Sequence, residues 1–244
     1  MKHLLLLALL ATAAAGPRSG YDDASPETRA MQDDDSANPG FLWVREGEAQ
    51  WSRPAGPDGK SCASCHGDAT VSMLGVAARY PVVDPILAQP LTLDRRIVQC
   101  RTERQHAEAL QPDSDAALGL SAYVGLQSRG MPVRVAADSR FVEAGRTISN
   151  TRMGQLNLSC AQCHEESAGG KLAGTVIPQG HPNGYPEYRL EWQTMGSLNR
   201  RLRNCMIGVR AEPYPPDSLE MAELALFLAA RAEGLKVETP AVRP

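Results

Sequence analysis

Residues 160–164 read Cys-Ala-Gln-Cys-His, and residues 62–66 read Cys-Ala-Ser-Cys-His. This C-x-x-C-H pattern is typical of c-type haem attachment, in which two cysteines hold the porphyrin by thioethers and the histidine ligates the iron. A zinc site or a redox dithiol is the alternative for one motif, and a second motif in the same chain disfavours both. We therefore predict two covalently bound haem c groups. The residues expected to hold them are Cys62, Cys65, His66, Cys160, Cys163 and His164.

The composition agrees with this interpretation. The chain has 244 residues, which suffices for one large domain or two small ones, and its formal charge of −3 gives no argument for nucleic-acid binding. Aromatic residues make up only 5% of the chain, which is thin for a large apolar core. Two haem groups would supply part of that core.

The first fifteen residues have the pattern of an export signal. Lys2 and His3 precede an apolar run from Leu4 to Leu10, and Ala13 to Ala15 form a small-residue cleavage site. A membrane anchor is the alternative, but about twelve apolar residues are fewer than the roughly 20 that span a bilayer. We expect cleavage near Ala15, a periplasmic location and no membrane span.

An internal repeat organises the rest of the chain. Gly47 and Gly145 lie 98 positions apart, as the two haem motifs do, and Cys100 and Cys205 lie 105 apart. A fixed period of about 100 residues indicates duplication of one small domain. We predict an all-α fold of two tandem cytochrome c-like domains with long loops around the haems. The expected units are a signal peptide (1–15), a flexible leader (16–38), a first haem domain (39–133) and a second haem domain with a surface tail (134–244). The expected helices cover 41–49, 93–101 and 113–130.

Two cysteines remain after haem attachment, Cys100 and Cys205. A disulfide between them is the alternative, since exported proteins often contain one. Each cysteine, however, holds the same place in its own repeat, which favours one local role in each, namely ligation of the iron opposite His66 or His164. Other side chains able to ligate iron do not recur in the repeat; they are Met131, Met153, Met195, His106 and His181. The histidines stay minor candidates. Thiolate ligation should lower the haem potential.

Arginines surround Cys205 within the run Ser197 to Met206, which reads SLNRRLRNCM. Arg201 lies one helical turn before Cys205 and therefore on the same face. A solvated basic face is the common meaning of such a cluster. Guanidinium groups also favour a thiolate and bind oxyanions bidentately. We therefore predict that Arg201 and Cys205 handle an anionic sulfur compound.

Five stretches of the second half then carry a family resemblance. They are 183–186 (Asn-Gly-Tyr-Pro), 188–189 (Tyr-Arg), Trp192, 196–206 and 238–240 (Glu-Thr-Pro). With them, the chain resembles the diheme A subunit of the SoxAX cytochrome of thiosulfate-oxidising bacteria, an L-cysteine S-thiosulfotransferase. The resemblance covers essentially the whole chain after the signal, and both haem motifs are intact.

The resemblance implies a reaction, partners and site roles. His66 and Cys100 would ligate the first iron, and His164 and Cys205 the second, with Cys205 present as a persulfide. Arg201 would be the active-site arginine that binds thiosulfate. The enzyme would join thiosulfate oxidatively to a cysteine of the sulfur-carrier YZ protein. Two electrons would pass through haem to a monohaem X subunit, the heterodimer partner, and on to a soluble cytochrome c. The role of the first haem stays open.

Three other functions compete with this one. A thiosulfate dehydrogenase would form tetrathionate and need no carrier protein. A simple diheme electron carrier would need no reactive cysteine. A diheme peroxidase would need an open or displaceable iron ligand with acid–base groups nearby, and no persuasive set of such groups is evident.

Overall fold

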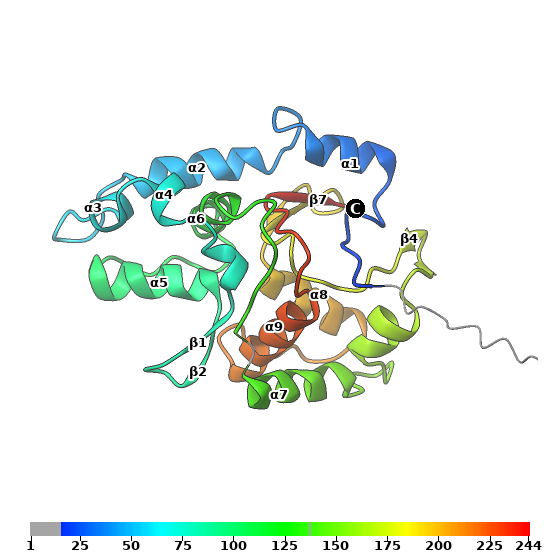
Figure 1. Cartoon of the computed structure of the whole chain (residues 1–244). Helices are drawn as coiled ribbons and strands as arrows, with labels where there is room; N and C mark the ends of the chain where they lie inside the picture. Colours follow the sequence, from blue (N-terminus) through cyan, green and yellow to red (C-terminus); the bar gives the residue numbers. More distant parts are fainter. Residues whose placement is uncertain (1–15, 137) are drawn as a thin grey trace, which may run out of the picture.

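The computed structural model describes residues 16–136 and 138–244, so the predicted export signal lies outside the described residues. The helices are α1 (Pro26–Asp33), α2 (Phe41–Trp51), α3 (Cys62–His66), α4 (Ala69–Ser72), η1 (Ala77–Arg79), α5 (Leu93–Arg104), α6 (Asp115–Leu126), α7 (Ser139–Asn150), η2 (Gln162–Glu166), α8 (Leu198–Gly208) and α9 (Leu219–Arg231). The strands are β1 (Val82–Asp84), β2 (Gln89–Leu91), β3 (Lys171–Leu172), β4 (Thr175–Val176), β5 (Glu187–Arg189), β6 (Thr194–Gly196) and β7 (Ala241–Arg243). The fold is therefore mainly helical, as expected, but it also contains short sheets that the all-α prediction omitted (Figure 1).

Each half is built around one crossing of two helices. In the first half α2 packs on α6, and a Cβ at Gly47 would lie only 2.0 Å from the Gly119 carbonyl oxygen. In the second half α7 packs on α9, and a Cβ at Gly145 would lie 2.2 Å from the Glu223 carbonyl oxygen. The missing side chain lets the helix backbones touch at both crossings. The equal placement of these glycines explains why they recur in the repeat.

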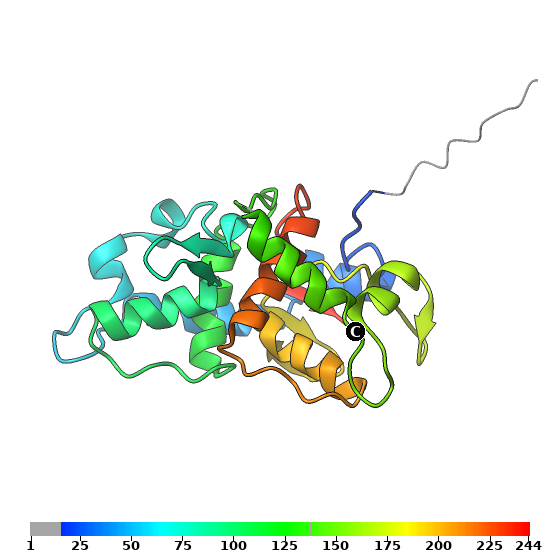
Figure 2. The same ribbon diagram turned by 90° about the horizontal axis from the view of Figure 1, so that it is seen from below.

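The repeat extends beyond these helices. The α5 helix and the β1–β2 hairpin recur as α8 and the β5–β6 hairpin at an offset of 105, while α6 recurs as α9 at an offset of 104. Ser114 and Ser218 begin α6 and α9 in the same way, because each side chain accepts a hydrogen bond from a backbone N–H of the first turn. Figure 2 shows the two halves side by side, with α5 in one and α8 in the other.

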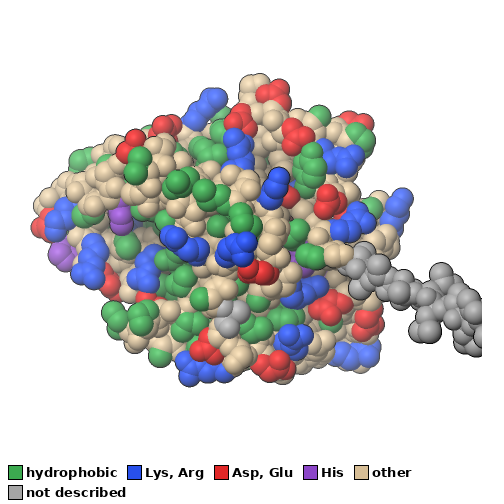
Figure 3. All heavy atoms as spheres, in the orientation of Figure 1, with side chains coloured by type: hydrophobic (Ala, Val, Ile, Leu, Met, Phe, Trp, Pro, Cys, Tyr) green, Lys and Arg blue, Asp and Glu red, His purple; other side chains and the backbone are tan. Residues whose placement is uncertain are grey.

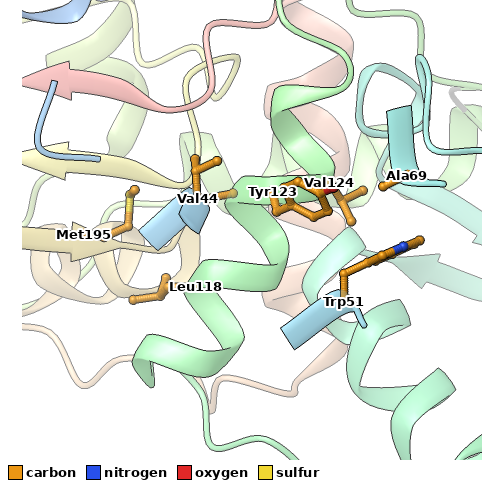
Figure 4. Close-up of a cluster of buried hydrophobic side chains, with 8 residues drawn as sticks. Val44, Trp51, Ala69, Leu118, Tyr123, Val124 and Met195 are labelled. Carbon is orange, nitrogen blue, oxygen red and sulfur yellow. The ribbon is translucent and has the colours of Figure 1, made fainter. Parts of the chain in front are cut away.

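The first half has a core of buried side chains between α2, α4 and α6 (Figure 4). Trp51 and Tyr123 meet edge to face there, with ring centroids 6.0 Å apart. Met195 of the second half is fully buried in the same cluster. The two halves therefore share packing, and Met195 is a core residue rather than a free candidate ligand.

The segment 16–38, predicted to be a flexible leader, is ordered in the structure. The Ser25 side chain caps α1 by accepting a hydrogen bond from Thr28 N–H, and Pro26 occupies the first helical position. The Asn38 side-chain amide donates to the Pro240 carbonyl oxygen at 2.9 Å. This segment is held by hydrogen bonds to the distant tail rather than by apolar burial, and low hydrophobicity alone therefore misled the prediction.

The tail, predicted to lie on the surface, is buried. Strand β7 pairs parallel to β5, so the sheet runs in the order β6-β5-β7. Ala241 and Val242 have 0% exposed surface, and α1 covers this strand (Figure 1). The Val242 N–H also donates to Gln32 Oε1 at 3.0 Å. The tail thus joins the segment before α2 to the sheet of the second half.

Surface features give little further guidance. Lys and Arg are interspersed with Asp and Glu on the face drawn in Figure 3, in keeping with the near-neutral net charge. Among the described residues, no helix is long and apolar enough to cross a membrane.

Candidate haem centres

The first C-x-x-C-H motif forms the short helix α3. The Ser61 and Ser64 side chains cap its first turn reciprocally, each accepting the other's backbone N–H. The Trp51 indole N–H donates to the Gly67 carbonyl oxygen at 2.9 Å, and its ring lies 5.8 Å from that of His66. The core helix α2 therefore fixes the position of the motif.

The second motif begins as a helical turn at Cys160 and continues as the π-helical segment η2. Ser159 and Gln162 cap each other as Ser61 and Ser64 do. His164 Nδ1 lies 2.7 Å from the Pro178 carbonyl oxygen, which only accepts hydrogen bonds, so Nδ1 carries the proton. Nε2 is left with its lone pair available for iron, which is the usual arrangement of a ligating histidine.

The surroundings of His164 also favour a neutral ligand. Burial lowers the pKa of His164, and the positive charges of Arg201 and Arg231 lower it further, while the hydrogen bond to Pro178 acts in the opposite direction. Gly180 passes close to the ring, because a Cβ there would lie 3.1 Å from His164 Cγ. The loop 178–180 therefore holds the imidazole in one orientation.

No disulfide joins Cys100 and Cys205 in the structure, so the alternative considered for this pair is not observed. Cys100 and Cys205 instead each lie near the haem motif of their own half. Burial raises the pKa of the Cys160 thiol to about 11, and Cys205 lies close enough to contribute to this increase through its charge when ionised. Burial raises the pKa of Cys62 as well, and Cys100 lies close enough to contribute through its charge when ionised. Cys100 and Cys205 therefore belong to separate sites.

Helices α5 and α8 each have one face that lines a groove and one face that turns away from it. A groove of about 670 Å³ runs between the halves and is lined by Leu93 and Val98 of α5 and by Leu198 and Leu202 of α8. Neither Cys100 nor Cys205 lines this groove, and neither do the arginines one turn before them. The cysteine-bearing faces of both helices therefore turn away from the groove.

The residues present fit a covalent haem at each motif. In the second half, the two thiols of the motif, an imidazole with a free nitrogen and the nearby thiol of Cys205 would form the donor set. None of the twelve residues of α5 is buried, and these include Ile97, which does not line the groove. A flat apolar group against α5 would cover such half-exposed side chains.

The minor candidate ligands have other surroundings. His106 is exposed and lies 3.2 Å from Asp58. His181 Nε2 lies 3.1 Å from Gln179 Oε1, while its buried Nδ1 has no hydrogen-bond partner among residues 16–136 and 138–244. Met131 and Met153 pack at the edges of apolar clusters.

Arg201 joins a chain of charged side chains beside the second motif. Its Nη1 lies 3.3 Å from Glu191 Oε1, and the same oxygen lies 3.0 Å from Arg189 Nε. Arg189 Nη1 in turn lies 3.1 Å from Glu187 Oε1, and this pair is buried. Burial and the Glu187 carboxylate raise the pKa of Tyr185, so its hydroxyl stays neutral. Sequence reasoning singled out Arg201 but missed Glu187 and Glu191.

The other arginines of α8 are used differently. The Arg200 guanidinium lies 4.3 Å from the centre of the Trp192 ring. Arg203 Nη1 donates to the Tyr214 carbonyl oxygen at 3.3 Å. Arg201 is therefore the arginine of this helix that combines an exposed counterion with proximity to His164.

The fold and the motifs are those of a c-type cytochrome built from two tandem domains. The family model named "SoxA/TsdA, cytochrome c domain" matches the chain over residues 46–133 and again over 144–237. The chain is 40% identical to the L-cysteine S-thiosulfotransferase subunit SoxA of Pseudaminobacter salicylatoxidans, over 92% of this chain and 80% of that protein. It is also 40% identical to the subunit of the same name from Rhodovulum sulfidophilum, over 93% and 80%.

A solved structure agrees with these matches. The crystal structure of SoxXA from P. pantotrophus superposes with a TM-score of 0.90 at 36% identity, covering 93% of this chain and 87% of that chain. The chain belongs to the SoxA family. The resemblance inferred from the motifs is thereby confirmed.

Proposed function

We propose that this chain is the diheme A subunit of a periplasmic L-cysteine S-thiosulfotransferase. It would join thiosulfate to a cysteine of a sulfur-carrier protein. The observation that supports this most directly is the placement of Arg201 and Cys205 on one face of α8 beside the second haem motif. The family membership and the names of the relatives agree with it.

Covalent haem c at both motifs would have His66 and Cys100, and His164 and Cys205, as iron ligands. When bound, the haem groups would accept the two electrons that the reaction releases. The domain limits 39–133 and 134–244 remain part of this proposal.

The overall chemistry is an oxidation that forms one S–S bond. A carrier thiol, R–SH, and thiosulfate, S₂O₃²⁻, give R–S–S–SO₃⁻, one proton and two electrons. A Cys205 persulfide divides this into two steps. In the first, Cys205–S–SH and thiosulfate give Cys205–S–S–S–SO₃⁻ with loss of a proton and two electrons. In the second, the carrier thiolate takes the S–SO₃⁻ group by disulfide-type exchange and leaves the Cys205 persulfide restored.

This chain's own side chains have distinct tasks in that scheme. The Arg201 guanidinium presents a planar set of N–H donors that suits two sulfonate oxygens. Cys205 lies four residues later and carries the reacting sulfur on the same helix face. The His164 ring is held by the Pro178 carbonyl oxygen and by the loop at Gly180.

The proposed partners are a monohaem X subunit, the sulfur-carrier YZ protein and a soluble cytochrome c acceptor. The neighbouring solved structure is a SoxXA complex by its title, which supports the X subunit as the heterodimer partner. The location would be the periplasm after removal of residues 1–15.

The test is thiosulfate-dependent reduction of the haem-loaded complex with the X subunit, with and without a carrier peptide that ends in cysteine. We expect a mass increase on the peptide that matches addition of S–SO₃⁻, and its loss in Cys205→Ala. Tetrathionate formed without any need for the peptide would instead indicate a thiosulfate dehydrogenase. Absence of any thiosulfate-dependent reduction, with electron transfer kept in Cys205→Ala, would indicate a simple electron carrier.

A further inference from the structure

Arg96 and Arg201 occupy equivalent positions, four residues before Cys100 and Cys205, but they have different counterions. Arg96 Nη2 forms an ion pair with Asp84 Oδ2. The Asp84 side chain is only 4% exposed, and its Oδ1 accepts the backbone N–H groups of Ile86 and Leu87, each at 2.9 Å. The carboxylate that neutralises Arg96 is therefore fixed to the β1–β2 turn.

The second half reverses this charge. Position 189, which is equivalent to 84 in the repeat, is an arginine at the end of β5 instead of an aspartate at the end of β1. The Arg189 side chain is 9% exposed and is held by the buried Glu187. Arg201 consequently has no fixed carboxylate from this strand position and meets another guanidinium there.

The counterion of Arg201 comes from the adjacent turn. Glu191 is 49% exposed, and one of its oxygens bridges Arg201 and Arg189 at 3.3 and 3.0 Å. Two arginines here face two carboxylates, so the group is neutral as long as Glu191 remains in place. When the Glu191 side chain turns toward solvent, Arg189 and Arg201 face Glu187 alone and the group becomes an anion site.

We propose that Glu191 is a displaceable counterion that occupies the anion-binding position of Arg201 until the sulfonate of thiosulfate replaces it. Arg189 is a positioning residue that keeps the position electropositive, and Asp84 excludes anions from the equivalent position in the first half. This inference rests on the proposed function for the identity of the anion. It explains why only one of two similar arginines is free to bind substrate.

The test is thiosulfate binding to the oxidised, haem-loaded complex with the X subunit, measured by titration calorimetry without carrier protein. Glu191→Gln should bind thiosulfate about two- to fivefold more tightly, because an exposed ion pair that competes with the ligand is removed. In turnover with the carrier, the same variant should show a KM for thiosulfate lowered by a similar factor.

The matched control is Glu233→Gln. Glu233 is also 49% exposed and also pairs with an arginine, Arg134, at 3.6 Å. This variant loses the same formal charge and should bind thiosulfate as the wild type does. Equal tightening in both variants would overturn the proposal in favour of a general charge effect, and an unchanged or weaker affinity in Glu191→Gln would overturn it as well.

Failure of the proposed function gives a different result. Tighter thiosulfate binding in Glu191→Gln, abolished by adding Arg201→Ala, would support the displaceable counterion even if no carrier conjugate forms. A normal conjugate with no effect of Glu191→Gln would leave the proposed function intact and refute the counterion alone.

Discussion

Alanine substitutions at the two equivalent arginines should have opposite effects. Arg201→Ala removes a guanidinium that is 30% exposed and whose partner Glu191 is 49% exposed, so folding stability should change little. The effect of Arg201→Ala should instead appear as a lower kcat/KM for thiosulfate. Hydrogen bonds from a charged group to an oxyanion contribute about 1.5–3 kcal/mol.

Part of that energy offsets the exposed pair with Glu191, which contributes about 0.2–1 kcal/mol. The net loss of transition-state stabilisation is then about 0.5–2.8 kcal/mol, or about two- to hundredfold in kcat/KM for thiosulfate. Both haems should be retained, because Arg201 supplies neither a thioether cysteine nor an imidazole ligand.

Arg96→Ala should leave thiosulfate turnover of the folded protein unchanged and should lower the urea midpoint, because it leaves the Asp84 carboxylate buried without its cation. The assay is thiosulfate- and carrier-dependent reduction of the complex, together with urea unfolding followed by circular dichroism. Loss of turnover in Arg96→Ala equal to that in Arg201→Ala would refute the assignment of different roles to the two arginines.

Three further predictions concern the fold around the site. Gly145→Ala should destabilise the protein by about 1–3 kcal/mol in urea unfolding, because its Cβ would lie 2.2 Å from the Glu223 carbonyl oxygen. Gly208→Ala is the control and should be near neutral, because a Cβ there meets nothing within 4 Å. Burial, followed by the charge of Arg231, lowers the pKa of His181 to about 4, so unfolding binds a proton as the pH falls from about 6.5 toward 4. Wild-type stability should therefore drop by up to about 2 kcal/mol from pH 7.5 to pH 5 through this group, and His181→Gln should show a smaller drop. Deletion of residues 239–244 removes the fully buried strand β7 and should lower the thermal midpoint by several degrees; an unchanged midpoint would contradict its structural role.

The parts of the fold that the sequence predicted are those encoded locally. The C-x-x-C-H motifs and the helices around Cys100 and Cys205 each depend on a few adjacent residues. The repeat located the equivalent positions, and the structure extends that equivalence to the β1–β2 and β5–β6 hairpins. Short strands of three residues carry too little periodicity to be recognised alone.

The missed parts depend on distant contacts. The segment 16–38 and the tail order each other through the contacts of Asn38 with Pro240 and Gln32 with Val242. Neither segment is apolar enough to suggest this by itself. A sequence signal did exist for α1, because Ser25 and Pro26 form a recognisable helix start.

The charge difference between the two halves is also present in the sequence, at positions 84 and 189. Asp94 and Asn199 differ within the helices. The decisive charge reversal, however, is Asp84 against Arg189, which lie twelve residues before Arg96 and Arg201. A strand residue determines whether an arginine on a neighbouring helix is neutralised by a fixed carboxylate or by a displaceable one. Duplication thus provides two similar backbones with the same arginine and cysteine spacing, and one exchanged charge is sufficient to make their anion affinities differ.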